Sequence, residues 1–133
     1  MRHSHPVRVY YEDTDLAGIV YYANYLKFIE RGRSEWVAAL GIDQMALRKD
    51  PGIVFAVRRV EADYMRPARF GDDLMVTTRL QTVGGARIIL KQEVLRGAER
   101  LFAAVVNLVC LTEGGTAHRV PNEVRARMLG QLQ

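Results

Sequence analysis

The apolar residues of this chain change their spacing once, and that change limits the folds open to it. Before Gly41 they recur every three or four residues, which is typical of a helix with one buried face. From Ile53 onward they recur every second residue, as in strands that bury one face. The chain is therefore expected to combine one substantial helix with a sheet.

The long helix is expected to begin near Tyr22 or Ala23 and to end near Gly41. Its apolar stripe comprises Tyr25, Phe28, Ile29, Gly32, Trp36 and Leu40. We interpret this stripe as the surface that packs against the sheet, and not as the lining of a cofactor site. A short second helix is expected over residues 43–48, before a turn at residues 50–52.

Five strands are expected, over residues 7–11, 53–64, 74–83, 87–95 and 101–111. Short glycine-containing turns separate the last three, so these should pair antiparallel. The last strand is apolar at almost every position, which is typical of a strand covered on both faces, and we expect it inside the sheet. Pro121 should open a C-terminal helix that runs through Leu129.

These elements predict an α+β fold in which an antiparallel sheet wraps around one long helix. No repeat, low-complexity tract or linker is visible, and a single domain over residues 1–133 is expected. Because one main helix is little cover for so much sheet, a dimer is expected to cover the rest.

The chain is basic without being polycationic, since 19 Lys and Arg oppose 15 Asp and Glu for a formal charge of +4. Its basic residues are scattered among acidic ones, which argues against nucleic acid and favours a small anionic ligand or a solvated surface. Cys110 is the only cysteine, so a disulfide within the chain and a cysteine zinc cluster are excluded. Its apolar neighbours predict a buried, inert thiol in an intracellular protein.

The N-terminal residues 1–6 lack the apolar region of a signal peptide, and no later apolar run is long enough to span a bilayer. A soluble, cytoplasmic protein is therefore expected. We expect His3 and His5 to lie on an exposed, flexible terminus, and we expect no metal site.

The chemistry of the chain is expected in residues 10–25, where carboxylates, one glycine and several aromatic residues precede the long helix. Such a segment can place an acid beside a helix N-terminus, whose free N–H groups and dipole attract negative charge. The plainest alternative is that residues 13–15, Asp-Thr-Asp, only make a turn with side-chain to backbone hydrogen bonds.

Residues 11–33 form a long motif with an unusual order of residue types. It reads Tyr11-x-Asp13-Thr14-Asp15-x-x-Gly18-Ile19-Val20-Tyr21-x-x-x-Tyr25-x-x-Phe28-x-Glu30-x-x-Arg33. This motif resembles the signature of the 4-hydroxybenzoyl-CoA thioesterase family, which has the hotdog fold, and it is most similar to the Tol-Pal-associated acyl-CoA thioesterases. Further matches are Val57-Arg58, Pro67-Ala68-Arg69 and Asp72-Asp73-Leu74. The resemblance extends from Pro6 to the C-terminal helix and implies an acyl-CoA thioesterase with no cofactor beyond the coenzyme A of its substrate.

The resemblance also implies a role for each part of the motif. Asp15 would be the reactive carboxylate, either as a nucleophile that forms a mixed anhydride or as a base that activates water. Gly18 would let the backbone approach the substrate closely. The N–H groups at Tyr22 and Ala23, where the helix starts, would polarise the thioester carbonyl.

Other residues carry less specific signals. Tyr11 and Asp13 are expected to support the loop, Asp13 by capping it or by meeting an arginine. Glu30 and Arg33, three residues apart on the helix, are interpreted as an intrahelical pair or a subunit contact. Candidates for contacts with coenzyme A phosphates, each of which also suits a solvated surface, are Arg58, Arg59, Arg87 and Lys91.

One departure from the family affects the expected chemistry. Many Tol-Pal-associated members carry a catalytic histidine where this chain has Tyr22, which resembles the aromatic residue of the 4-hydroxybenzoyl-CoA enzyme. The alternative function is therefore a non-catalytic acyl-CoA or acyl-carrier binding module at the cell envelope. A hotdog dehydratase is disfavoured, because no histidine lies in a suitable motif. The family further implies a homodimer or homotetramer, with acyl carrier protein as another candidate partner.

Overall fold

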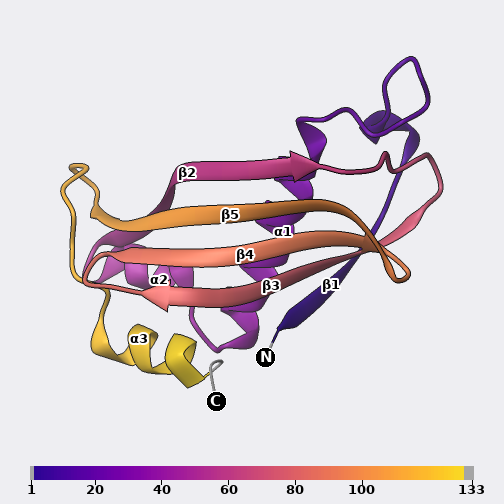
Figure 1. The fold of residues 1–133 in the computed structure, drawn as a ribbon. Coiled ribbons are helices and arrows are strands. Elements are labelled where there is room, and N and C mark those ends of the chain that lie inside the picture. The colour runs from indigo at the N-terminus through magenta and orange to yellow at the C-terminus, as the bar shows by residue number, and fades with distance from the viewer. Residues whose placement is uncertain (1, 131–133) are drawn as a thin grey trace.

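One antiparallel sheet and one long helix dominate the computed structural model, which describes residues 2–130 (Figure 1). The five strands of the sheet are β1 (His3–Arg8), β2 (Ile53–Tyr64), β3 (Asp73–Val83), β4 (Arg87–Arg96) and β5 (Glu99–Thr112), in the order β1-β3-β4-β5-β2. The described helices are α1 (Asn24–Ala39), α2 (Gln44–Lys49) and α3 (Asn122–Leu129), with a short 3-10 turn, η1 (Tyr11–Asp13). The predicted α+β architecture is confirmed. Met1 of the predicted flexible terminus and the last three residues of the predicted domain lie outside the described residues.

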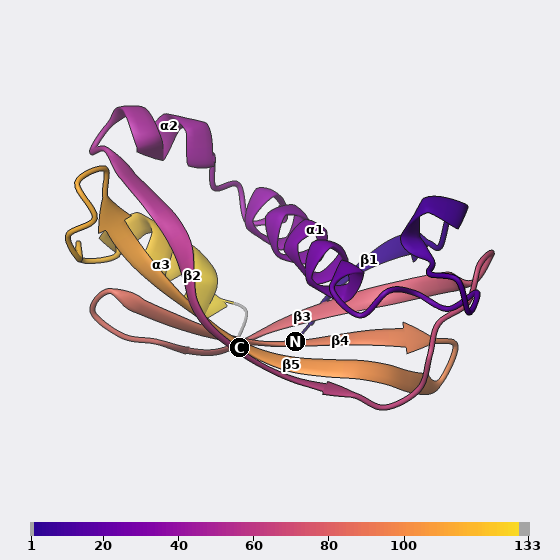
Figure 2. The ribbon, with the colours of Figure 1, turned by 90° about the horizontal axis from the view of Figure 1, so that it is seen from above.

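The sheet is strongly curved, and α1 lies in its hollow (Figure 2). Alternate residues of the strands point toward the helix and are buried, as their period of two predicts. The prediction that β5 lies inside the sheet is confirmed, since β4 and β2 flank it. The outer face of β5 differs from the prediction, because none of the described helices covers it. Ala103, Val105 and Val109 on this face are only half-buried in the single chain.

The helix α1 lies very close to β3 at Gly32. A Cβ atom built on Gly32 would lie 2.5 Å from Cγ1 of Val76, so only glycine lets the helix lie this deep. Beside this contact, the fully buried Gln92 donates from Nε2 to the carbonyl of Ile29 at 2.9 Å and to Oγ1 of Thr78 at 2.8 Å. These contacts fix the depth and rotation of α1 on the sheet.

The motif residue Arg33 takes part in the same buried cluster. Its Nη1 donates to Oε1 of Gln92 at 3.1 Å. Burial lowers the pKa of the Arg33 guanidinium, and the negative charge of Glu30 offsets part of that effect. Arg33 thus joins the helix to β4 by a hydrogen bond that the sequence did not predict.

The prediction for the N-terminal residues is wrong. His3 to Arg8 form the edge strand β1, with His3 opposite Thr78 and Arg8 opposite Asp73, and His3 and His5 are half-buried. The predicted strand over residues 7–11 therefore begins and ends too late, since Tyr11 already belongs to η1. Pro6 argues against a strand at these residues, but an edge strand tolerates a residue that donates no ladder hydrogen bond.

The other elements agree with the sequence predictions to within two residues at each end. The second helix is capped by Asp43, whose Oδ1 accepts from the N–H groups of Met45 and Ala46. Within residues 2–130, no helix combines the length and the apolar content that crossing a membrane requires.

Candidate active site

Two loops meet at one end of the sheet, and the first of them carries the N-terminal part of the predicted motif (Figure 1). The first loop joins β1 to α1, and the second joins β2 to β3. The N–H of Val20 donates to the carbonyl of Ala68 at 2.8 Å, and the N–H of Gly71 donates to the carbonyl of Val9 at 3.0 Å. The motif and the Pro67-Ala68-Arg69 segment, which are far apart in sequence, are therefore direct neighbours.

Asp15 lies at the start of a tight, exposed turn in the first loop. Its Oδ1 accepts from the N–H of Ala17 at 2.9 Å, and its carbonyl accepts from the N–H of Gly18 at 3.0 Å. Gly18 has φ of +77°, a left-handed conformation that favours glycine. Residues 13–15 thus do make a turn, but the second carboxylate oxygen of Asp15 accepts no hydrogen bond from the described residues.

Asp13 faces back into its own loop. Its Oδ2 accepts from the N–H of Tyr10 at 2.8 Å, so its carboxylate caps the loop. Its carbonyl accepts from Nδ2 of Asn24 at 2.9 Å and from the N–H of Tyr21 at 3.0 Å. Because Asn24 is the first residue of α1, the loop that carries Asp15 is tied directly to the start of the helix.

The helix α1 starts without a side-chain cap, because the residue at its N-cap position is Ala23. Among the described residues, the N–H groups of Tyr22 and Ala23 have no acceptor. The carbonyl of Tyr22, by contrast, accepts from the hydroxyl of Tyr64 at 3.1 Å. Two N–H groups at the positive end of a 16-residue helix are thus free to bind a negatively charged or polarised oxygen.

Aromatic rings pack behind the helix start and order it. Tyr25 stacks on Phe102 with centroids 5.0 Å apart and an interplanar angle of 10°, and its hydroxyl accepts from the N–H of Ala68 at 3.0 Å. Tyr64 lies edge-on to Tyr22 at 6.1 Å, to Tyr25 at 5.5 Å and to Phe102 at 5.0 Å. Burial raises the pKa of both Tyr25 and Tyr64, so their hydroxyls keep their protons at neutral pH.

Tyr11 lies apart from this group. Its ring is 82% exposed and meets Phe70 of the second loop edge-on at 6.4 Å. Its carbonyl accepts from the hydroxyl of Thr14 at 2.7 Å, which closes the turn ahead of Asp15. Its support for the loop therefore comes from its backbone and from packing.

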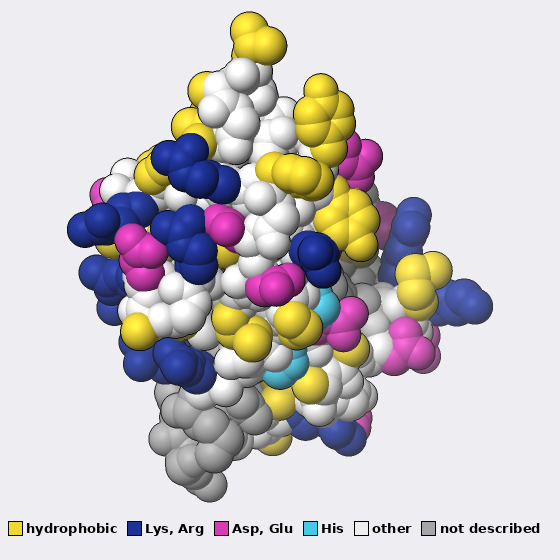
Figure 3. All heavy atoms as spheres, turned by 90° about the vertical axis from the view of Figure 1, so that its right-hand side faces the viewer, with side chains coloured by type: hydrophobic (Ala, Val, Ile, Leu, Met, Phe, Trp, Pro, Cys, Tyr) yellow, Lys and Arg dark blue, Asp and Glu magenta, His cyan; other side chains and the backbone are white. Residues whose placement is uncertain are grey.

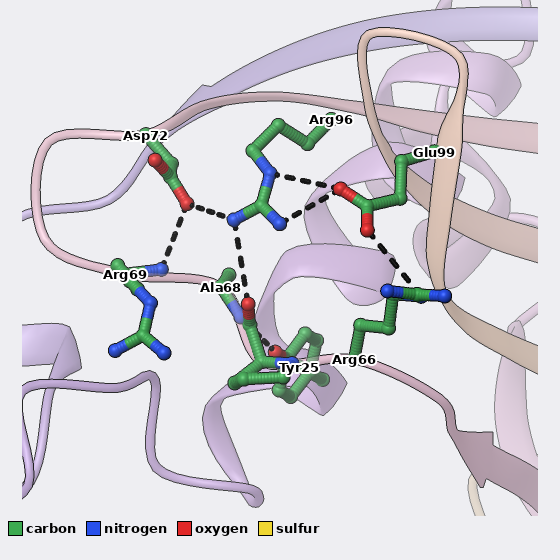
Figure 4. A network of polar contacts seen from close by, with 8 residues as sticks. Tyr25, Arg66, Ala68, Arg69, Asp72, Arg96 and Glu99 are labelled. Atoms are coloured by element: carbon green, nitrogen blue, oxygen red, sulfur yellow. Dashed lines mark hydrogen bonds and ion pairs between the residues drawn. The ribbon is translucent and has the colours of Figure 1, made fainter.

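A network of charges holds the second loop in place (Figure 4). Arg96 donates from Nη1 to Oδ2 of Asp72 at 2.7 Å and from Nη2 to Oε1 of Glu99 at 2.8 Å. The same oxygen of Asp72 accepts from the N–H of Arg69 at 2.8 Å. Burial by itself raises the pKa of Asp72, but the N–H of Arg69 and the Arg96 guanidinium outweigh it and hold that pKa below its usual range. The sequence marked Asp72 as part of the family pattern but gave no local sign of its partner Arg96.

Apolar side chains are exposed at this end of the molecule among arginines and carboxylates (Figure 3). The exposed large apolar residues of the two loops, the helix start and the end of β2 are Tyr10, Tyr11, Leu16, Tyr21, Tyr22, Leu26, Tyr64, Met65 and Phe70. Leu16, next to Asp15, has no cover at all from the rest of the chain. An acyl group or a second protein surface would find apolar contacts here.

The four basic candidates for coenzyme A phosphates lie on β2 and β4, apart from the loops. Arg59 is paired with Glu61 at 2.8 Å, and Arg58 is its exposed neighbour. Arg87 begins β4 opposite Val109, at the end of the strand away from Arg96. Lys91 lines a hollow of about 340 Å³ on the outer face of the sheet. A single chain does not bring these residues to Asp15.

Metal ligands do not gather in the described part of the chain. Within residues 2–130, no three His, Cys, Asp or Glu side chains come together in an arrangement that could hold a metal ion. Cys110 is buried on β5, and burial raises the pKa of its thiol, which suits the inert role expected from its apolar neighbours.

Comparisons with known proteins show which proteins this chain is similar to. A sequence model of the thioesterase superfamily matches residues 17–103. The chain is 40% identical over 124 residues to the acyl-CoA thioesterase YbgC of Haemophilus influenzae, which covers 92% of this chain and 91% of that protein. It is 37% identical over 107 residues to the acyl-CoA thioester hydrolase YbgC of Escherichia coli, with 80% and 79% covered.

Solved structures show the same fold. The crystal structure of a probable thioesterase from Bartonella henselae is similar with a TM-score of 0.88 and 37% identity, covering 91% of this chain and 100% of that one. The predicted hotdog fold and the predicted family resemblance are thereby confirmed. With the superfamily model matched over the helix and most of the sheet, the chain belongs to the thioesterase superfamily.

Proposed function

We propose that this protein hydrolyses acyl-CoA thioesters to a free acid and coenzyme A, with Asp15 as its reactive carboxylate. The observation that carries the proposal is the free oxygen of Asp15 on a loop that Asp13 ties to the uncapped start of α1. Relatives at 37–40% identity that are named acyl-CoA thioesterases support this choice of substrate.

The proposed reaction uses both parts of the site. The thioester carbonyl oxygen binds at the N–H groups of Tyr22 and Ala23, and each such donor stabilises the developing oxyanion by about 2.7–4 kcal/mol. Asp15 either attacks the carbonyl carbon or removes a proton from a water that attacks it. If Asp15 acts as the base, the proton that it takes from water passes to the sulfur as the C–S bond breaks, which gives the free acid and the thiol of coenzyme A. If Asp15 is the nucleophile, coenzyme A leaves as a thiolate that takes a proton from water, and a second water then hydrolyses the anhydride, which releases the acid and restores the Asp15 carboxylate. The turn at Gly18 admits the substrate to Asp15, and no cofactor beyond the substrate's own coenzyme A is required.

We further propose that the protein works as a homodimer or homotetramer in the cytoplasm. The half-buried apolar residues on the outer face of β5 and the exposed apolar side chains around Asp15 support a partner surface. In such an assembly, Arg58, Arg59, Arg87 or Lys91 of one chain would lie near the site of another and would bind coenzyme A phosphates. Acyl carrier protein and the Tol-Pal system at the cell envelope are the further partners that we propose from the family resemblance.

Release of free thiol from a panel of short-chain, long-chain and aromatic acyl-CoAs tests the proposal. Asp15→Asn is expected to abolish release and to leave the fold intact, because an amide oxygen still accepts from the N–H of Ala17. Glu12→Gln, an exposed carboxylate of the same loop, is the matched control and should keep wild-type activity. Wild-type protein without turnover on the whole panel, or an active Asp15→Asn variant, would contradict the proposal.

The second candidate is a non-catalytic module that binds acyl-CoA, and the observation in its favour is Tyr22, which stands at the helix start where many relatives of the resembled group carry a histidine. Calorimetry with a non-hydrolysable thioether analogue of acyl-CoA separates the two functions. Binding of the analogue by a wild-type protein that releases no thiol would establish the second.

A further inference from the structure

Tyr64 is the last residue of β2, and its hydroxyl lies beside the start of α1. It donates to the carbonyl of Tyr22 at 3.1 Å, across 42 residues of sequence. The carbonyl of Tyr22 and the N–H of Ala23 belong to one peptide group. Because a trans peptide is planar, its N–H points away from its carbonyl oxygen, and fixing one direction fixes the other.

We infer that Tyr64 is a positioning residue that aims and polarises the N–H of Ala23, the donor assigned above to the thioester carbonyl. This inference rests on the proposed function. A hydrogen bond received by the carbonyl of a peptide group strengthens the N–H of that same group as a donor. Tyr64 thus acts on the substrate through the backbone and does not touch it.

The packing around Tyr64 gives its hydroxyl the rigidity that positioning requires. Its ring contacts Tyr22, Tyr25 and Phe102, with centroids 5.0–6.1 Å apart. Tyr25 is itself stacked on Phe102 and held by the N–H of Ala68. The ring of Tyr64 therefore has neighbours on several sides, although half of its surface is exposed at the rim of the site.

The backbone arrangement leaves this role to Tyr64. The start of α1 has no side-chain cap, and Asn24, the first helical residue, uses its side chain to hold Asp13. Tyr64 is the described side chain that binds the Tyr22–Ala23 peptide from outside the loop and the helix. Removing its hydroxyl frees this peptide to rotate, while the ring contacts persist.

The test compares Tyr64→Phe with Tyr21→Phe, which removes the hydroxyl of a neighbouring exposed tyrosine. The Tyr21 substitution keeps the apolar ring, and the lost hydroxyl binds nothing among the described residues. Steady-state thiol release is measured with the best acyl-CoA of the panel, so that kcat and KM are separated. We expect Tyr64→Phe to lower kcat about tenfold with KM nearly unchanged, and Tyr21→Phe to change neither. The loss is smaller than the roughly 10²–10³-fold that removal of a direct oxyanion donor costs, because the amide itself remains.

A spectroscopic measurement distinguishes positioning from a merely structural role. In the Asp15→Asn background, the infrared stretch of an isotopically labelled thioester carbonyl reports the hydrogen bonds that the bound substrate accepts. We expect a shift to lower frequency on binding, and we expect Tyr64→Phe to reduce this shift while Tyr21→Phe leaves it unchanged. If Tyr64→Phe does not fold, 3-fluorotyrosine at residue 64 replaces it in the test. This more acidic phenol, kept protonated, is expected to enlarge the shift.

The outcomes separate this inference from the proposed function. Wild-type kcat and an unchanged carbonyl shift in Tyr64→Phe, in a protein whose Asp15→Asn variant is inactive, would refute the inference alone. An unchanged shift with 3-fluorotyrosine would do the same. Absence of turnover by the wild-type protein would refute the proposed function, and the inference with it.

Discussion

Replacement of Gly32 by alanine tests how α1 is seated on the sheet. A Cβ atom at this position would lie 2.5 Å from Cγ1 of Val76 and 3.3 Å from its Cβ. Rotation of the Val76 side chain moves Cγ1 but leaves Cβ where it is, and Val76 is fully buried on an interior strand. Since carbon atoms pack best at about 3.5–4.0 Å, the helix or the strand must move.

Two opposing effects determine how much Gly32→Ala changes the free energy of unfolding. Alanine in place of glycine inside a helix stabilises by about 1 kcal/mol, whereas overpacking a well-packed core costs about 1–3 kcal/mol. We expect overpacking to win, so that Gly32→Ala lowers the free energy of unfolding by up to about 2 kcal/mol. Val76→Ala alone removes two buried methyl groups and should cost about 2–3 kcal/mol. In that background the 2.5 Å contact is gone and only the 3.3 Å contact with the Cβ of residue 76 remains, so Gly32→Ala should be close to neutral, or stabilising by up to about 1 kcal/mol.

Urea unfolding of the wild type, the two single variants and the double variant closes a double-mutant cycle. Trp36, the only tryptophan, is buried one turn farther along α1, so its fluorescence reports the unfolding and the environment of the helix. We expect a favourable coupling energy of about 1–3 kcal/mol between the two substitutions. Stabilisation by Gly32→Ala in the wild-type background, or strict additivity of the two changes, would show that α1 and β3 are not in close contact at Gly32.

Three further predictions concern the loops and the core. The pKa of Asp72 is lower in the folded protein than in the unfolded chain. Its contribution to stability is therefore present above the unfolded pKa of about 4 and is lost as the pH falls through the folded value. The difference in unfolding free energy between the wild type and Asp72→Asn, measured in urea at several pH values, should shrink below about pH 4. Gly18→Ala should destabilise the protein by about 1–2 kcal/mol through its φ of +77° alone, since no atom lies within 4 Å of the added carbon, and unchanged stability would contradict the left-handed turn. Cys110 should not react with a thiol reagent until urea unfolds the protein, and rapid reaction of the native protein would contradict its burial.

The helix and the last four strands could be predicted because their apolar residues repeat over many positions. The helix presents its buried residues every three or four positions, and β3 and β4 bury every second one. Period two also places Gln92 inward between Leu90 and Val94, a signal that would have found the buried glutamine before the structure. Its partners Arg33 and Thr78 come from other elements, so their hydrogen bonds leave no local trace.

The edge strand β1 shows where sequence patterns fail. Residues 3–6 read His-Ser-His-Pro, with little apolar alternation and a proline that cannot donate. They form a strand because β3 offers an unpaired edge, and pairing with it is a property of the tertiary structure. At Tyr10 and Tyr11 the prediction fails in the opposite sense, because their aromatic character favours a strand and the structure has none there. The chain turns at this point because the carboxylate of Asp13 accepts from the N–H of Tyr10.

The position of Arg33 explains why the motif continues far beyond Asp15. The catalytic chemistry as proposed needs only the loop and the first N–H groups of α1, but those groups are useful only if the helix lies at the right depth and rotation. Gly32 sets the depth against Val76, and the hydrogen bond from Arg33 to Gln92 sets the rotation. The later part of the motif is therefore understood as the support of the helix start. This predicts that Gln92→Leu lowers kcat as well as stability, although Gln92 is buried between the helix and the sheet and touches no substrate.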